Sequence, residues 1–122
     1  MKYLLDSVIV IDHFNGVEAA TTFLAKHGSG CAISVTTRAG VLTGFNMKTE
    51  SLARELLDVF TNLPITSDIA DLAASLRRRE HWKLPDALQA AVAAQHGLVL
   101  VTRNTRDFKV GGKLNVLVPY RL

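Results

Sequence analysis

Three aspartates stand where their carboxylates could act together on a substrate. Asp6 directly follows the first apolar run of the chain, Asp86 lies in the first turn of a predicted helix, and Asp107 lies in the polar segment TRNTRDF. Unpaired carboxylates gathered in a buried place are electrostatically costly, and a divalent cation is the natural resolution. Oxygen ligands with open water positions suit Mg²⁺ or Mn²⁺. The pattern therefore predicts metal-assisted hydrolysis of a phosphodiester.

Each aspartate also has an ordinary structural explanation. Asp86 in a first helical turn could complement the helix dipole, Asp6 could close an Asx-turn, and Asp107 could bond to its own loop backbone. Acidic residues at helix starts and turns are common. What favours the catalytic interpretation is the expected placement of all three at one edge of the fold.

The apolar pattern predicts the elements that would bring the acids together. Short apolar runs typical of strands alternate with amphipathic stretches typical of helices, which implies a parallel sheet with helices on both faces. Ligands of such sheets bind beyond the carboxyl ends of the strands. Strands are expected at Tyr3–Leu5, Cys31–Ile33, Asn62–Ile65, Leu98–Val101 and Asn115–Val118. Helices are expected at Val8–Phe14, at Val17–Lys26, through Val41, Leu42 and Phe45, at Glu50–Phe60, from a cap at Ser67 or Asp68, and at Ala87–His96.

Composition narrows the class of protein. The chain has 122 residues, 48% of them hydrophobic and 20% charged, which fits a single folded domain over residues 1–122 and excludes a disordered chain. One cysteine, Cys31, excludes a disulfide scaffold and favours the cytoplasm. No apolar run approaches the roughly 18 residues of a membrane span, and Asp6 and Asp12 argue against a signal peptide. The net charge of +3 permits a polyanionic partner.

Four stretches together resemble a known family. They are YLLDSVIVID at the start, AISVTTRAGVLTGF after the second strand, LPDALQAAVA on the late helix, and LVTRNTRDF, which begins in the fourth strand. They fall in the family's order and cover most of the chain, and LPDAL and TRNTRDF are the more specific of the motifs. The chain resembles a PIN domain, most closely the VapC-type toxins of bacterial toxin–antitoxin pairs.

The resemblance carries expectations beyond the residues themselves. It implies an α/β fold, a three-layer α/β/α sandwich with a central, mainly parallel sheet. It implies an endoribonuclease that depends on Mg²⁺ or Mn²⁺ and cleaves RNA phosphodiester bonds. It also implies a small antitoxin as partner and a homodimer that forms a heterotetramer or a larger assembly with antitoxin, with no membrane partner.

Site residues can be carried over position by position. The resemblance matches the family's first acid to Asp6, its third to Asp86, and a more variable fourth to Asp107, and these would be the metal ligands. The family's polar residues beside the metal match Ser7, Thr102 and Asn104.

One position departs from the family's pattern. Gly40 stands where the family has its second acid, a Glu. Glycine inside a helix costs about 0.5–1 kcal/mol relative to Ala, and Gly44 already offers a helix end four residues later. An engineered substitution that disarms a toxin, a naturally degenerate copy, or close packing of another helix would each explain Gly40. Because one acid is absent, we expect ribonuclease activity to be weak or lost while the fold is kept.

Cationic residues near the acids are candidates for RNA contact. Arg103 and Arg106 flank the proposed site and are predicted to bind the RNA backbone. The run Arg77–Arg79 is better explained as a solvated helix end, where cations are favourable with the dipole.

Three other classes of protein are alternatives to a ribonuclease. A phosphorylated receiver domain would need a second acid adjacent to Asp6 and a late lysine, and a haloacid-dehalogenase-like phosphatase would need an acid where Val8 stands. Both therefore fail at named positions. The stronger alternative is a non-catalytic module on the PIN scaffold that binds antitoxin or RNA without cleaving it.

Overall fold

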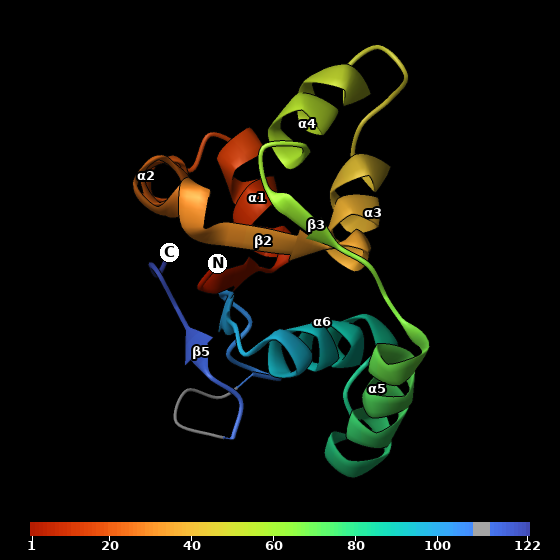
Figure 1. Cartoon of the computed structure of the whole chain (residues 1–122). Helices are drawn as coiled ribbons and strands as arrows, with labels where there is room; N and C mark the ends of the chain where they lie inside the picture. Colours follow the sequence, from red (N-terminus) through yellow and green to blue (C-terminus); the bar gives the residue numbers. More distant parts are fainter. Residues whose placement is uncertain (109–112) are drawn as a thin grey trace.

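The computed structural model describes residues 1–108 and 113–122, and the described part of the chain contains a five-stranded sheet. The strands are β1 (Tyr3–Leu5), β2 (Cys31–Ser34), β3 (Thr61–Leu63), β4 (Val99–Val101) and β5 (Val116–Leu117). Their order across the sheet is β3-β2-β1-β4-β5, and every neighbouring pair is parallel (Figure 1). The predicted strands all form, with ends that move by one or two residues.

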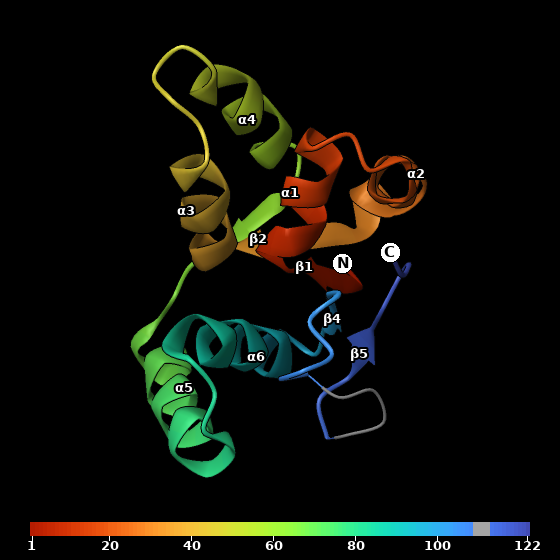
Figure 2. The ribbon, with the colours of Figure 1, turned by 180° about the vertical axis from the view of Figure 1, so that it is seen from behind.

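Helices cover both faces of this sheet. One face carries α1 (Ser7–Phe14), α2 (Glu18–His27), α3 (Val35–Thr43) and α4 (Glu50–Leu57), and the other carries α5 (Ser67–Glu80) and α6 (Leu84–His96), as both views show (Figures 1 and 2). A short 3-10 turn, η1 (Gly28–Gly30), leads into β2. The prediction of a three-layer α/β/α fold with a parallel sheet is confirmed. Across residues 1–108 and 113–122, no helix has the length and apolar character needed to span a membrane.

Two apolar cores lie on the two sides of the sheet, because successive strand side chains point to opposite faces. Leu4 and Leu100 pack with the buried residues of α5 and α6. Leu5, Ile33 and Val101 pack instead with the buried residues of α1, α3 and α4. The strands near the centre are therefore buried on both faces, which explains why they read as continuous apolar runs. This packing holds the strand ends in place.

Several helix ends differ from the predicted positions by one to three residues, and two of these differences have a clear local cause. The helix predicted through Phe45 stops at Thr43, where Gly44 is the C-cap. The cap of α5 is Thr66, one residue before the predicted candidates, because its hydroxyl accepts a hydrogen bond from the Ile69 N–H at 3.3 Å. Both differences arise from local cap geometry and leave the order of elements unchanged.

The inward face of α4 also differs from the predicted one. The period over Glu50–Phe60 predicts that Leu52 and Val59 point inward, but their side chains are 64% and 69% exposed. The helix buries Ala53 and Leu57 instead. The helix ends at Leu57, so Val59 lies in the turn that follows and does not continue the helical period. The prediction was therefore wrong for Leu52 and Val59. Leu56 and Phe60, which the same prediction placed inward, do pack against the core.

Substitutions within α4 test this assignment of faces. Leu57→Ala should lower the free energy of unfolding by about 2–5 kcal/mol, because it leaves a cavity at a fully buried position. Leu52→Ala in the same helix is the matched control and should change it by about 0.5 kcal/mol or less. Urea denaturation of both variants measures the difference. Equal losses for the two leucines would contradict the burial described here.

Candidate active site at the carboxyl end of the sheet

The ends of β1 and β4 are the place where polar side chains gather. Leu5 pairs with Val101 in the parallel register, so Asp6 and Thr102 follow at adjacent strand ends. The Asp6 N–H donates to the Val101 carbonyl oxygen at 2.9 Å, which extends the pairing to the residue itself. The chain builds β2 and β3 on one side of β1, and β4 and β5 on the other. Such a switch in strand order is where open α/β sheets bind ligands.

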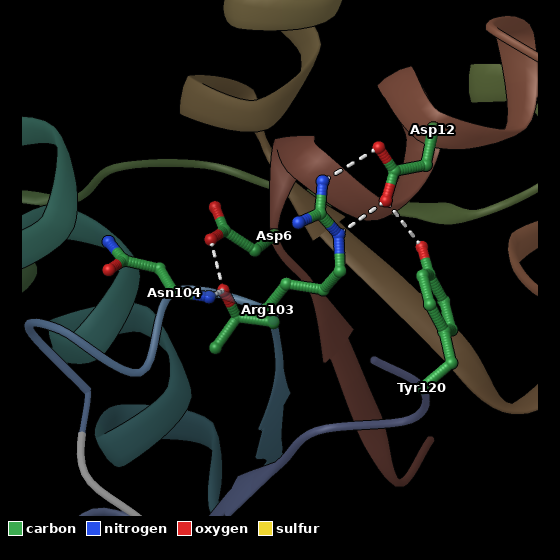
Figure 3. Close-up of polar contacts among 6 residues, drawn as sticks. Asp6, Asp12, Arg103, Asn104 and Tyr120 are labelled. Atoms are coloured by element: carbon green, nitrogen blue, oxygen red, sulfur yellow. Dashed lines mark hydrogen bonds and ion pairs between the residues drawn. The ribbon is translucent and has the colours of Figure 1, made fainter. Parts of the chain in front are cut away.

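Asp6 is a nearly buried carboxylate with a full set of donors. Its residue is 7% exposed. Oδ1 accepts from the Ser7 N–H at 2.9 Å and from Gln89 Nε2 at 3.3 Å. Oδ2 accepts from Thr102 Oγ1 at 2.6 Å (Figure 3). Asp6 is also the N-cap of α1. The capping role and the predicted site role therefore fall on the same residue, and the donors hold both oxygens in fixed positions.

A chain of hydrogen bonds connects Asp6 to Asp107 through the loop after β4. Thr102 Oγ1, which donates to Asp6, accepts from the Asn104 N–H at 2.9 Å. Asn104 Nδ2 then donates to Asp107 Oδ2 at 3.1 Å, and Asn104 Oδ1 accepts from the Asp107 N–H at 3.3 Å. The structure thus brings together Thr102, Asn104 and Asp107 with Asp6, as the sequence predicts.

Asp86 enters the same electrostatic environment from α6. Pro85 lies in the first turn of this helix, and Asp86 is the acid of that turn. Burial, the charges of Asp107 and Asp6, and a side-chain hydrogen bond to Asp107 raise the pKa of Asp86 from 3.8 to about 6, against the opposing effect of Lys83. Asp6, Asp86 and Asp107 therefore interact as one group, which we call the acidic edge.

The acidic edge has carboxylate oxygens that could bind a hard cation, but these oxygens are not arranged as a complete set of metal ligands. Carboxylate oxygens are the ligands that Mg²⁺ and Mn²⁺ prefer. Burial and the neighbouring like charges, which together raise the pKa of Asp86, disfavour its carboxylate form, and a bound cation would stabilise that form. Within the described ranges, however, no three Asp, Glu, His or Cys side chains are arranged so that they could hold a metal ion as they stand. The three metal ligands remain a prediction.

Gly40 lies on α3 beside the acidic edge, with room for a side chain. A Cβ at this position would lie 3.6 Å from Ser7 Cβ and 3.8 Å from Ser7 Oγ, which is ordinary van der Waals contact. No neighbour approaches so closely that glycine is required, so close packing does not explain the residue. Because Ser7 follows Asp6 directly, a longer side chain at position 40 would begin next to the acidic edge.

Sequence reasoning missed the buried amide that supports Asp6. Gln89 is 3% exposed and follows Asp86 by three residues, so the two share a face of α6. Its Nε2 donates to Thr37 Oγ1 as well as to Asp6, and its Oε1 accepts from Ser34 Oγ. A single amide inside the alanine-rich stretch LPDALQAAVA was the available signal.

A second polar centre, also missed, forms on the other side of the same loop. Arg103 Nε and Nη2 donate to the two oxygens of Asp12 at 2.6 and 2.9 Å, and the Tyr120 hydroxyl donates to Asp12 Oδ2 at 2.8 Å (Figure 3). The hydrogen bond from Arg103 holds the pKa of Asp12 below its usual value, although burial opposes the effect. Burial and the neighbouring Asp12 raise the pKa of Tyr120. The predicted contact of Arg103 with RNA remains untested.

Of the other cationic residues named from the sequence, Arg79 and Arg106 line a cavity of about 800 Å³. Arg106 is exposed and lines this cavity together with Asp107 and Trp82. At the end of α5, Arg77 donates to the Trp82 carbonyl oxygen at 2.8 Å, as expected for a helix-end cation. Arg106 is therefore the cationic residue of the prediction that lies beside the acidic edge and remains exposed.

Comparisons with known proteins identify relatives of the whole fold. Residues 3–113 match the family model described as PIN domain. The chain is similar to a toxin–antitoxin complex from Klebsiella pneumoniae, with a TM-score of 0.90 and 37% identity over 99% of this chain and 100% of that chain. FitAcB from Neisseria gonorrhoeae (TM-score 0.79, 24% identity, 98% of this chain and 99% of that one) and DNA-bound VapBC from Salmonella typhimurium (0.80, 20%, 96% and 97%) share the fold. The comparison with curated proteins gives no match.

The raised pKa of Asp86 predicts a pH-dependent effect on stability. The folded state keeps the Asp86 proton up to about pH 6, whereas the unfolded chain loses it near pH 4. Stability is therefore lost as pH rises between these values, and the loss is complete above the folded pKa. Asp86→Asn removes the charge, so it should raise the free energy of unfolding by about 1 kcal/mol at neutral pH, after allowance for solvent screening of this partly exposed group, and by little near pH 4.

Urea denaturation at both pH values, with a chelator present, measures this effect. Asp68→Asn is the matched control, because Asp68 also stands in a first helical turn but is exposed. A gain for Asp86→Asn that is the same at both pH values would contradict the assignment.

Proposed function

This chain belongs to the PIN domain family, and on that premise we propose that it is the toxin of a toxin–antitoxin pair. The support is its likeness, over nearly the whole of both chains, to a chain of a toxin–antitoxin complex. The partner would be a small antitoxin. The proposed assembly is a homodimer, joined by antitoxin into a heterotetramer or a larger complex in the cytoplasm.

The proposed chemistry is hydrolysis of RNA phosphodiester bonds at the acidic edge. The observation that carries it is the gathering of Asp6, Asp86 and Asp107 beyond the carboxyl ends of β1 and β4, where burial and the neighbouring like charges raise the pKa of Asp86. These three residues would hold Mg²⁺ or Mn²⁺. When bound, such an ion lowers the pKa of a water ligand and neutralises phosphate charge.

The surrounding residues have roles that follow from their contacts. Thr102 and Gln89 orient the carboxylate of Asp6, and Asn104 orients that of Asp107. Polar partners of this kind fix the direction of ligand oxygens and tune their affinity for a cation. Arg106, exposed beside Asp107, is placed to pair with an RNA phosphate. Ser7 would line the site opposite position 40.

Gly40 limits the proposed activity. With three carboxylates, the acidic edge would hold a cation less tightly than with four, and two metal ions would be harder to support. We therefore propose a toxin whose ribonuclease activity is weakened or lost while its fold and its binding of antitoxin are kept.

Restoring an acid at position 40 tests this proposal. Gly40→Glu should raise metal-dependent cleavage of a mixed RNA pool by about tenfold or more, because a fourth carboxylate would strengthen cation binding. Cleavage is measured with Mg²⁺, with Mn²⁺ and with a chelator. No gain in a folded Gly40→Glu protein would contradict the assignment of position 40 to the site.

Three control variants make the result specific. Gly40→Gln adds a side chain of the same length without the charge and should give no gain. Ala39→Glu adds the same acid to an adjacent exposed position of α3 and should also give none. Asp86→Asn in the Gly40→Glu protein should abolish cleavage. Activity retained in that double variant would remove Asp86 from the site.

A non-catalytic module is the second candidate function. It is favoured by Gly40 and by the finding that, in the part of the chain the structure describes, no acidic, histidine or cysteine side chains form a ready-made metal site. Such a protein would bind antitoxin or RNA without cleaving it.

Calorimetry with Mn²⁺ distinguishes the two candidates. A weakened enzyme should bind Mn²⁺ in its natural form, more tightly as Gly40→Glu, and with a loss of about tenfold or more on Asp86→Asn. A non-catalytic module should bind no Mn²⁺ in its natural form while it still binds antitoxin or RNA. Mn²⁺ binding unchanged by Asp86→Asn would show that the ion binds elsewhere.

A further inference from the structure

We propose that Asp12, Arg103 and Tyr120 form a clamp that positions the loop carrying Thr102, Asn104 and Asp107 against Asp6. We call these three residues the Asp12 clamp. They are positioning residues, because their contacts are with each other and not with the acidic edge. The expected effect of the clamp on cation binding rests on the proposed function. Its expected effect on the loop rests on the hydrogen-bond geometry alone.

The loop after β4 is held from two opposite sides. Thr102 and Asn104 direct their side chains to Asp6 and Asp107. Arg103 between them directs its side chain to Asp12 (Figure 3). A shift of Arg103 would therefore displace both of its neighbours, and with them the hydrogen bonds that orient the acidic edge.

The contact between Asp12 and Arg103 is unusually well defined. The Asp12 side chain is 8% exposed and that of Arg103 is 30% exposed, so solvent competes little for the carboxylate. Both carboxylate oxygens are engaged by two nitrogens of one rigid guanidinium, a geometry that fixes direction as well as distance. A lysine in place of Arg103 would keep the charge but lose this two-pronged contact.

The clamp also gives Arg103 a role different from RNA binding. Asp12 occupies Nε and Nη2 of the guanidinium, so an RNA phosphate could take these donors only by displacing a carboxylate that is almost out of solvent, and it would otherwise have to bind through Nη1. Leaving one partner of such a pair without the other is strongly unfavourable. The described contacts of Arg103 are therefore those of an internal anchor.

Tyr120 attaches the C-terminal segment to the same point. Its hydroxyl donates to Asp12 Oδ2, and the Thr102 N–H donates to the Leu117 carbonyl oxygen of β5 at 3.1 Å. Helix α1, the loop after β4 and the segment after β5 thus meet at Asp12, although Asp12 and Tyr120 are 108 positions apart. The loop cannot move independently of these elements.

Substitutions in the clamp test the proposal with two measurements. One is hydrogen exchange at the Asn104 and Asp107 amides, compared with the Ala90 amide of α6, in the natural chain. The other is Mn²⁺ affinity by calorimetry, in the natural chain and in Gly40→Glu. Asp12→Asn should speed exchange at the two loop amides by about tenfold and weaken Mn²⁺ binding by about tenfold or more. Arg103→Lys and Tyr120→Phe should each give smaller losses in the same direction, because each variant removes only part of the contact with Asp12.

Two controls separate positioning from general stability. Leu57→Ala destabilises the protein from α4, outside the clamp, and should leave Mn²⁺ affinity unchanged. The double variant Asp12→Asn with Arg103→Gln should lose no more Mn²⁺ affinity than either single variant, because the two residues act through one contact. Should Asp12→Asn fail to fold, the Arg103→Lys result decides the question.

Three outcomes would overturn the inference. They are unchanged loop exchange and Mn²⁺ affinity in folded Asp12→Asn, additive losses in the double variant, and RNA binding weakened by Arg103→Gln but not by Asp12→Asn. If neither the natural chain nor Gly40→Glu binds Mn²⁺, the proposed function fails, and the exchange measurement alone decides whether the clamp holds the loop.

Discussion

The carboxylate of Asp6 lies at the end of the central strand with little access to solvent, and a buried charge must be surrounded by donors. Those donors come from the start of α1, from the loop after β4 and from the middle of α6, which are far apart in sequence. In the described part of the chain, every buried side-chain nitrogen and oxygen has a hydrogen-bond partner. The arrangement of these elements around the strand end therefore follows from the need to satisfy one carboxylate.

A second constraint acts against the first. Bringing Asp86 and Asp107 near Asp6 adds like charges to a poorly solvated place, and Asp86 responds with a raised pKa. A bound cation would stabilise the ionised form of Asp86, and cation binding is the chemistry proposed for this site. Gly40 leaves space where a further acid would increase both the repulsion and the affinity for a cation. A further acid at this edge is thus expected to lower the stability of the metal-free protein and to raise its affinity for a metal ion.

The loop after β4 shows how one short segment serves two purposes. Alternate side chains face the acidic edge and the Asp12 clamp, so packing of α1 and the C-terminal segment bears directly on the position of Asp107. Surface loops that carry functional residues are usually the most variable parts of a fold. Here an ion pair with little exposure replaces the rigidity that a helix or strand would supply.

The order of strands and helices along the chain, the parallel sheet, and the expectation that Asp6, Asp86 and Asp107 share one edge could all be predicted from the sequence, because apolar periodicity, strand ends and helix starts are local properties. The sequence did not reveal that Ala53 and Leu57 form the buried side of α4, since Val59 lies beyond the helix and a leucine such as Leu52 can stand exposed on a protein surface. Nor did it reveal Gln89, Asp12 or Tyr120 as polar partners. Those roles depend on contacts between residues as many as 108 positions apart, and only the tertiary structure decides which distant side chains meet.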